Sequence, residues 1–345
     1  KAVRRVRRRE LARISMADVL GNLSVQEVGE GLTALTTATL AGALDAAKLE
    51  WERSRGPLPI RFALILMGRL GGHESGYGSD ADVMFVHEPL PDAADPGSAA
   101  GCAQWLAQKV RSALAMPGQD PPLEVDADLR PEGKSGPLVR SLDSYRTYYA
   151  KWSDTWEAQA LLRAEAVVGD QALCEQFTKL IDPLRYPEGG LTDKEVREIR
   201  RIKARIETER LPRGANPATH LKLGRGGLAD VEWTIQLIQM QHAHAVPALR
   251  TTRTLDGIDA AAEAEILTGE DAEALKEAWL MVTRIRNGTV LWRNKTAESM
   301  VTDPQDLVGV AHVLGLGQEN SGPMVNEYLR ATRRARKVVE NVFYG

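Results

Sequence analysis

The sequence has few of the features that would direct a chain to a membrane or an oxidising compartment. It contains only two cysteines, Cys102 and Cys174, and they lack the spacing of metal ligands. This scarcity argues against a disulfide framework or a zinc site and suits a reducing compartment. No apolar run approaches the length of a membrane span, and the basic N-terminus lacks the apolar core of a signal peptide. We therefore expect a cytoplasmic chain without membrane contact.

Aromatic residues and net charge are scarce as well. Aromatic residues make up 5% of the 345 residues, and the formal net charge is −3. A chain without a net positive charge and with so few rings for stacking bases is not expected to bind nucleic acid. Hydrophobic residues at 43% and charged residues at 26% are ordinary for a globular protein, and the length suggests two or three domains. The helical pattern is already under way at Lys1, which indicates a piece of a longer chain.

The most informative stretch lies between residues 62 and 88. An apolar run ends at Leu66, a glycine-rich bend follows, and a second apolar run begins directly after Asp80 and Asp82. If the second run is a strand, its side chains alternate between two faces, so both aspartates project to the same side and can share a hard cation. Magnesium is usually held by one or two carboxylates together with substrate phosphates, and glycine amides can cradle phosphate. This order predicts a site for a nucleoside triphosphate with magnesium, although Asp, Gly and Ser are also common in plain surface turns.

A second acidic segment follows at residues 123–130. Apolar and charged residues alternate strictly, which predicts a strand. Its charged face carries Glu124, Asp126, Asp128 and Arg130. Such a face is either solvated or directed into a site, and Lys134 in the glycine-bounded turn that follows favours a site.

The remaining pattern is mainly helical and divides the chain into three expected domains. Residues 1–56 form an N-terminal helical segment, in which a capping box at residues 24–27 opens a long helix. Residues 57–168 contain the strands. Residues 169–345, which show no convincing strand, form a helical bundle, in which residues 192–195 cap a long charged helix. The expected fold is therefore α+β and helix-rich, with a small mixed β-sheet followed by the α-helical bundle.

Three further segments carry specific expectations. The arginine-rich residues 1–13 are expected to be a solvated helix face. Residues 91–101 are rich in Pro, Gly and Ala and are expected to form a loop. Residues 142–168 follow a helical pattern that places Trp152 and Trp156 one turn apart, which is typical of core packing.

The motifs resemble those of the DNA polymerase β-like nucleotidyltransferases. In those enzymes, a Gly-Gly or Gly-Ser turn precedes a strand with an Asp-x-Asp motif, and a later strand carries a third carboxylate. The corresponding residues of this chain are Gly71-Gly72 and Asp80-Ala81-Asp82. The closer resemblance, over nearly the whole chain, is to the glutamine synthetase adenylyltransferases. Four segments carry it in order, namely 67–86, 125–138, 156–164 and 222–233. The form of residues 78–82 and the basic C-terminal helix are similar to the C-terminal, adenylylating half of those bifunctional enzymes.

This resemblance implies a Mg²⁺-dependent transfer of AMP from ATP to a tyrosine of glutamine synthetase, with residues 57–168 as the nucleotidyltransferase domain. Asp80, Asp82 and Asp126 would be catalytic and would hold two Mg²⁺ ions. Asp128, on the same expected face as Asp126, is a second candidate for the third metal ligand, and relatives often have Arg at that position. Glutamine synthetase would be the protein substrate, and a PII-type nitrogen-signalling protein is a further expected partner.

The resemblance also implies a set of nucleotide contacts. The expected residues are Arg69, Gly71, Gly72, Ser79, Arg130, Lys134 and Arg163. Arg163 has the alternative of pairing with Glu157 or Glu165. Weaker candidates surround the second glycine-rich turn at 224–227, whose amides lie before a helix and could meet an anion. These candidates are Lys222, Asp230 and Glu232, although acids at a helix start are also favoured by the helix dipole.

Three alternative functions are weighed against AMP transfer. The first is the adenylyl-removing reaction of the same family, in which phosphate strips AMP from the modified tyrosine. The second is a different polymerase β-like transferase that modifies RNA or a small molecule. The third is a regulatory module that binds nucleotide without turnover, although a pure binding role does not require three metal ligands.

Overall fold

The two apolar runs on either side of the glycine-rich bend form neighbouring strands. β1 (Ile60–Leu66) and β2 (Ala81–Pro89) are antiparallel and pair along the whole length of β1. Three shorter strands complete a mixed five-stranded sheet. β5 (Glu165–Gly169) is antiparallel to β1, whereas β3 (Val125–Asp126) and β4 (Val139–Ser141) are both parallel to β2. The small mixed sheet within a mainly helical chain confirms the expected fold class.

The chain divides into two compact units, each assembled from separate segments. The computed structural model describes all residues except 1, 92–95, 153, 297 and 318–320. The first unit, here called the sheet unit, comprises residues 1–14, 30–75 and 80–185. The second, the helical unit, comprises residues 15–29, 76–79 and 186–345. The expected domain boundaries after residues 56 and 168 stay a prediction.

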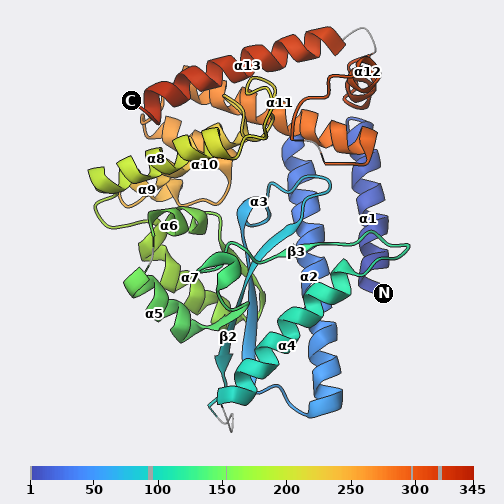
Figure 1. Ribbon diagram of the computed structural model, residues 1–345, viewed down its shortest axis with the longest axis vertical. Coiled ribbons are helices and arrows are strands. Elements are labelled where there is room, and N and C mark those ends of the chain that lie inside the picture. Colours follow the sequence, from blue (N-terminus) through green and yellow to red (C-terminus); the bar gives the residue numbers. More distant parts are fainter. Residues whose placement is uncertain (1, 92–95, 153, 297, 318–320) are drawn as a thin grey trace. The chain divides into compact units, whose positions relative to one another are not determined.

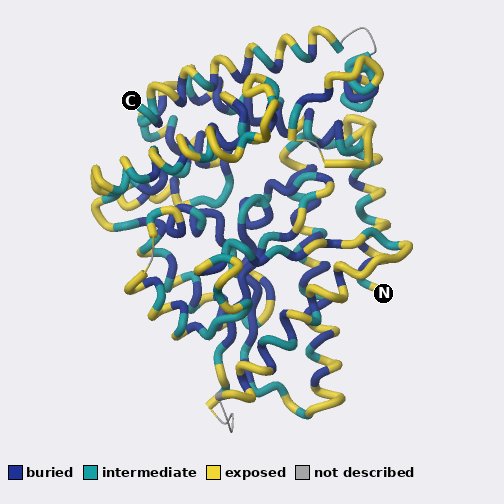
Figure 2. Tube along the Cα trace, in the orientation of Figure 1, coloured by how far each residue is buried: buried dark blue, intermediate teal, exposed yellow. Residues whose placement is uncertain are grey.

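Helices cover both faces of the sheet, so β1 and β2 are apolar almost throughout. On one face, Phe62, Leu64 and Phe85 pack in a core with helices α2 and α4. On the other face, Ile65 and Met84 pack with α5, α6 and α7 (Figure 1). The bounds of these helices are α2 Val25–Arg55, α4 Pro96–Ala115, α5 Leu142–Trp152, α6 Thr155–Leu161 and α7 Gln171–Arg185. Figure 2 shows the buried course of the two central strands.

Helix starts that depend on capping residues lie where the sequence predicts them. The Ser24 backbone N–H donates to Glu27 Oε2 at 2.7 Å, and the Glu27 N–H donates to Ser24 Oγ at 3.2 Å. α8 (Asp193–Glu209) begins after a second capping box formed by Thr192 and Glu195. Both boxes use only residues three apart, which explains why local sequence was sufficient to find them.

The expected tryptophan packing is wrong because the helix that carried it is interrupted. α5 ends at Trp152 and α6 begins at Thr155, after the N-cap residue Asp154. The two tryptophans therefore lie on different helices. Trp152 is 70% exposed and Trp156 is 37% exposed, so neither belongs to the core.

The expectation that the helical pattern continues to residue 168 is also wrong, because residues 165–169 form β5. This strand approaches β1 closely at Gly169, whose φ is +109°. A Cβ at Gly169 would lie 2.3 Å from the carbonyl oxygen of Phe62, so a glycine is required there. The helical pattern of the preceding residues hid this strand.

Two other segments differ from expectation. Residues 96–101 belong to α4, not to a loop, and Pro96 stands at the first helical position, where its missing N–H needs no partner. Residues 92–95 of that expected loop lie outside the described residues. In α1 (Ala2–Val19), Arg4 and Arg7 are buried, and Arg4 donates to the backbone carbonyls of the 116–120 loop, so this helix is not solvated all round.

The predicted strand at 123–130 shortens to the two residues of β3. The Asp128 backbone N–H donates to Asp126 Oδ1 at 2.7 Å, which turns the chain away from the ladder. Leu123, Val125 and Ala127 are buried as the alternation predicts, but Arg130 of the charged face is buried too.

The helical unit is a bundle, as expected for the C-terminal part of the chain. Its helices are α8, α9 (Leu228–His242), α10 (Thr254–Glu263), α11 (Gly269–Arg293), α12 (Pro304–Val313) and α13 (Ser321–Val342). Within the described residues from 186 onward, the β pairing is limited to an isolated bridge between His220 and Ser299. None of the described helices combines the length and apolar character of a membrane span.

Two early segments of the chain also belong to the helical unit. The Tyr77 hydroxyl donates to Asp18 Oδ2 at 3.0 Å, and Tyr77 is 8% exposed. A Cβ at Gly76 would lie 3.0 Å from Oδ1 of Asn287 on α11. The glycine-rich bend before Asp80 is thus partly built into the helical unit.

Candidate metal centre

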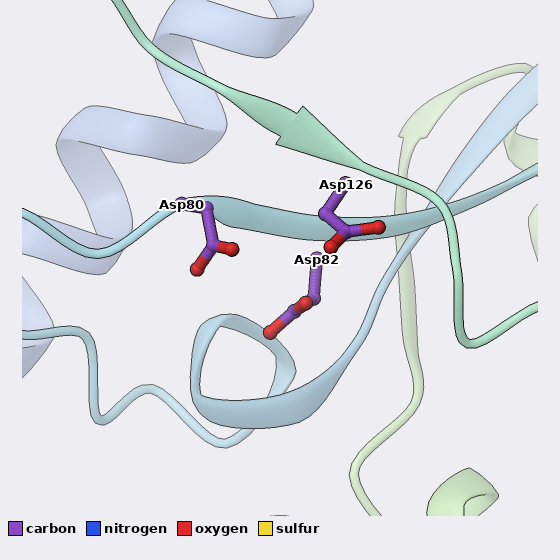
Figure 3. Close-up of side chains that lie close together, drawn as sticks. All are labelled: Asp80, Asp82 and Asp126. Carbon is purple, nitrogen blue, oxygen red and sulfur yellow. The ribbon is translucent and has the colours of Figure 1, made fainter.

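Three carboxylates converge where β2 and β3 begin their parallel pairing. Asp82 of β2 lies opposite Asp126 of β3, and Asp80 lies two residues before Asp82. One oxygen from each of the three carboxylates lies within 4.8 Å of the other two (Figure 3). Asp80 is exposed and the other two are partly buried, so the cluster is open to solvent on the Asp80 side. The structure therefore brings together the three aspartates that the sequence singled out.

Backbone contacts fix the strand ends that carry these carboxylates. The Ala81 N–H donates to the carbonyl of Glu124 at 2.8 Å, which ties the start of β2 to the segment before β3. The Met67 N–H donates to the carbonyl of Asp82 at 2.9 Å, which ties the end of β1 to the same place. Asp82 is therefore held from both neighbouring strands.

A short helical turn, α3 (Gly68–Gly71), lies directly beside the Asp82 carboxylate. Gly68 has a φ of +54°, and a Cβ at this position would lie 2.6 Å from Asp82 Oδ2. Glycine is required here both for its backbone conformation and for the space that it leaves. The first residue of the bend thus shapes the site through its missing side chain.

The contacts favour Asp126 over Asp128 as the third member of the cluster. Asp128 is not part of the described acidic group. Its carboxylate lies 3.1 Å from Lys134 Nζ and 3.5 Å from Arg130 Nη1, so it is already paired with two cations. The backbone N–H of Asp128 contacts the cluster, because it donates a hydrogen bond to Asp126 Oδ1.

The cluster fits a divalent cation that prefers oxygen ligands. At 4.8 Å, the upper limit of the separations here, two negative charges repel by roughly 1 kcal/mol in water-like surroundings and by about 3 kcal/mol near a protein surface. A cation between the carboxylates removes this cost. An oxygen-only set of aspartates suits Mg²⁺ or Mn²⁺, whereas zinc sites generally use His and Cys.

Arg163 lies beside the Gly71-Gly72 turn, where it forms a buried ion pair with Glu74. Both side chains are 7% exposed. A Cβ at Gly71 would lie 2.0 Å from the Arg163 carbonyl oxygen, and one at Gly72 would lie 2.3 Å from Arg163 Nη2. The two glycines therefore make room for this arginine. Glu74 was not found from the sequence, where it was one acid within a flexible bend.

The amides of the two glycines do not face outward as the sequence suggested. The Gly71 N–H donates to the Met67 carbonyl at 2.9 Å, and the Gly72 N–H donates to the Gly68 carbonyl at 3.1 Å. Arg69 is also engaged by the bend, because its Nε donates to the Glu74 carbonyl at 2.7 Å. This turn is stabilised internally by its own donors.

In two other residues expected to contact the nucleotide, Lys134 and Ser79, the side chain already has a partner. The Lys134 side chain is 84% exposed, and its ammonium group pairs with Asp128 at 3.1 Å on the surface, where such pairs contribute little stability. Ser79 Oγ accepts a hydrogen bond from the Gly76 N–H at 3.1 Å. Ser79 therefore closes the turn that directly precedes Asp80.

Comparison with known proteins shows the family to which the chain belongs. Residues 1–180 match the family of glutamate-ammonia ligase adenylyltransferases. The chain belongs to this family. Residues 198–344 match a second family, described as GlnD PII-uridylyltransferase.

Relatives of this adenylyltransferase family resemble the chain from end to end. The chain is 52% identical over its whole length to a bifunctional glutamine synthetase adenylyltransferase/adenylyl-removing enzyme of Streptomyces coelicolor, covering 35% of that protein. Enzymes with the same name from Mycolicibacterium smegmatis and Mycobacterium tuberculosis are also 52% identical, over 100% and 99% of the chain, and it covers 34% of each. The chain thus spans about a third of the length of these relatives.

The remaining site residues that the sequence suggested lie in the helical unit. Asp230 is 1% exposed and pairs with Lys203 and with Arg336, the latter at 3.0 Å. Its second oxygen also accepts the Gly226 N–H at 2.7 Å. Asp230 is therefore the centre of a buried ionic network.

The second glycine-rich turn folds onto itself and does not present its amides to an anion. The N–H groups of Gly224 and Gly227 donate to the carbonyls of His220 and Gly224 at 2.9 Å each. Lys222 is half exposed, and its ammonium group lies 3.9 Å from Glu298. Glu232 lies near Arg286 in the same unit and interacts with it electrostatically.

Proposed function

We propose that this chain transfers AMP from ATP to a tyrosine hydroxyl of glutamine synthetase and releases pyrophosphate. The observation that carries the proposal is the convergence of Asp80, Asp82 and Asp126 in a chain that is 52% identical to enzymes named for this activity. The alternatives of RNA modification and of nucleotide binding without turnover have no comparable support.

The three aspartates would hold Mg²⁺, and two ions are part of the proposal. When bound, the ions would neutralise charge on the phosphates and favour the ionised form of the attacking hydroxyl. The carboxylates would orient these ions because the pairing of β2 with β3 fixes the backbones of Asp82 and Asp126. A tyrosine hydroxyl has a pKa near 10, so its proton must leave as the oxygen attacks. A carboxylate of the cluster is the proposed acceptor of that proton.

The reaction itself exchanges one bond for another at the α-phosphorus. The tyrosine oxygen forms a bond to phosphorus while the bond to the pyrophosphate oxygen breaks. Such a displacement depends on positioning and on charge stabilisation. Lys134, with its exposed ammonium group, is the proposed contact to the triphosphate. Arg69, Arg163, Gly71 and Gly72 would act by shaping the bend, and Ser79 by closing the turn before Asp80.

The direction of the reaction and a second partner belong to the same proposal. The relatives are named for both adding and removing the adenylyl group, and we assign this chain to the adding half. A PII-type nitrogen-signalling protein is the proposed partner of the helical unit. The support is the match of residues 198–344 to a family described as PII-uridylyltransferase.

The proposal is tested with α-labelled ATP, Mg²⁺, purified glutamine synthetase and the chain. The expected result is label on a synthetase tyrosine, and Asp82→Asn should reduce the rate about a hundredfold or more without unfolding the protein. Asp128→Asn is the matched control and should change the rate only a few-fold. Unchanged labelling by Asp82→Asn would exclude the metal assignment.

A second incubation separates the two directions. Adenylylated glutamine synthetase and inorganic phosphate are mixed with the chain, and ADP is measured. ADP formation without label transfer in the first assay would identify the chain as the adenylyl-removing half.

A further inference from the structure

The nucleotide contact expected at Arg130 conflicts with the environment of its side chain. Arg130 follows β3 and is 8% exposed. An arginine that binds phosphate presents the fork of its guanidinium group toward the ligand. At Arg130 the fork is directed into the protein.

The guanidinium group of Arg130 is occupied by the loop that follows β3. It donates to four backbone carbonyls, those of Ala127 (2.7 Å), Lys134 (3.4 Å), Gly136 (3.1 Å) and Pro137 (3.1 Å). Nη1 also lies 3.5 Å from Asp128 Oδ1. A guanidinium group has five N–H donors, and these acceptors are sufficient for all of them.

The loop that Arg130 binds has a backbone conformation that is unfavourable by itself. Glu132 has a φ of +63° and Gly133 one of +55°, so two consecutive residues are left-handed. A left-handed conformation costs a non-glycine residue about 1–2 kcal/mol. A Cβ at Gly136 would lie 2.4 Å from the Pro131 carbonyl oxygen, which shows how tightly the loop returns on itself. Arg130 holds both ends of this loop from inside.

The loop begins with the third carboxylate of the metal centre. The Asp128 N–H donates to Asp126 Oδ1 at 2.7 Å, and the preceding carbonyl, that of Ala127, is the one nearest to Arg130. A peptide group held at its oxygen by Arg130 is thus held at its nitrogen by Asp126. The same arginine lies 3.5 Å from the Asp128 carboxylate, which is not part of the described acidic group.

We propose that Arg130 is a positioning residue that orients Asp126 toward the metal through the peptide between residues 127 and 128, and that it does not bind the triphosphate. The inference rests on the proposed function for the identity of the metal site. It also explains how a segment with two neighbouring aspartates commits one of them to the metal.

The test separates metal binding from nucleotide binding in Arg130→Lys. Lysine keeps the charge but cannot reach four carbonyls at once. Mn²⁺ binding is measured by electron paramagnetic resonance without nucleotide, and a non-hydrolysable ATP analogue is titrated by calorimetry at saturating Mn²⁺. We expect Mn²⁺ affinity to fall about tenfold, as for residues that orient metal ligands, and analogue affinity to stay within twofold. Saturating metal should restore most of the lost activity.

Two control variants define the scale of these effects. Arg140→Lys changes an arginine of the same unit that bonds to the side chains of Glu132 and Ser144, and it should leave Mn²⁺ affinity unchanged. Lys134→Ala shows what the loss of a phosphate contact looks like, because it should weaken the analogue and not Mn²⁺. A tenfold loss of analogue affinity in Arg130→Lys with normal Mn²⁺ binding would overturn the inference, as would normal binding of both.

A measurement on the unaltered protein keeps the inference testable if Arg130→Lys does not fold. The assigned Arg130 Nε–H resonance is followed by NMR while Mg²⁺ and the ATP analogue are added. If Arg130 is a positioning residue, its Nε–H should exchange slowly with solvent even without the analogue. Slow exchange that appears only when the analogue is bound would show that Arg130 binds phosphate. Label transfer to glutamine synthetase is assayed separately. A chain that binds Mn²⁺ but transfers no AMP would refute the proposed function and leave the Arg130 result intact.

Discussion

Removal of the buried Asp230 carboxylate should destabilise the helical unit without reducing the chemistry of the folded enzyme. In Asp230→Ala, Lys203 loses its buried partner while its own side chain stays only 2% exposed. Arg336 and the Gly226 N–H lose an acceptor at the same time. Among the described residues, the variant therefore leaves the buried Lys203 ammonium group with Glu207 as its remaining acidic partner.

The expected magnitude follows from the burial of this network. Breaking a buried ion pair by removing one partner typically costs about 3–5 kcal/mol. For a unit of roughly 180 residues, each kcal/mol lowers Tm by about 2–4 °C, so a fall of about 6–20 °C is expected. Asp259→Ala is the matched control. Its partner Lys276 is a surface cation of the same unit, and such pairs contribute about 0–1 kcal/mol.

The assay combines differential scanning calorimetry with label transfer measured well below the lower Tm. We expect Asp230→Ala to keep a kcat within a few-fold of the unaltered chain at that temperature. An unchanged Tm together with a loss of transfer of tenfold or more would show that Asp230 serves the reaction and that the structural reasoning is wrong.

Two further predictions concern the metal turn and the pH dependence of stability. Gly68→Ala should weaken Mn²⁺ binding about tenfold, because the added Cβ lies 2.6 Å from Asp82 Oδ2 and the backbone φ is positive; normal binding in a resonance titration would contradict this. Burial lowers the pKa of His220 below its ordinary value near 6.5, although the charge of Glu298 opposes the shift. Between the pKa of His220 in the folded state and about pH 6.5, the unfolded chain therefore binds more protons than the folded one. The contribution of His220 to stability is complete above about pH 6.5 and is lost as pH falls through the pKa of the folded state. His220→Asn, which keeps an acceptor for the Leu223 N–H, should flatten the urea-unfolding free energy between about pH 7 and 5, and an unchanged slope would exclude His220 as its source.

The parts of the fold that the sequence predicted depend on short-range chemistry. Capping boxes involve residues three apart, and the alternation that placed Asp80 and Asp82 on one face involves residues two apart. The alternation placed Asp126 on one charged face with Asp128, and the apolar face of that segment is buried as predicted. The choice of Asp126 within that face came from the resemblance to the nucleotidyltransferases. Such signals are complete within a few residues.

The parts that the sequence did not predict depend on partners far along the chain. β5 exists because residues 165–169 pair with β1, about a hundred residues earlier, and its local pattern was helical. Arg163 pairs with Glu74 across a similar separation. Arg130 has its partners nearby, but they are backbone carbonyls, which carry no mark in the sequence. A charged residue near a site is therefore easily interpreted as a ligand contact, whereas we propose that Arg130 supports the scaffold.

The interleaved layout of the two units has a consequence during synthesis on the ribosome. Residues 15–29 and 76–79 emerge early, yet the rest of the unit to which they belong starts at residue 186. Gly76 lies beside the side chain of Asn287 on α11, so this part of the bend must wait for a neighbour about two hundred residues later. Nascent chains with such delayed contacts expose apolar surface for longer and are prone to misassembly. For the same reason, a cut after residue 185 would not release two intact pieces, because the first piece would carry segments that belong to the second.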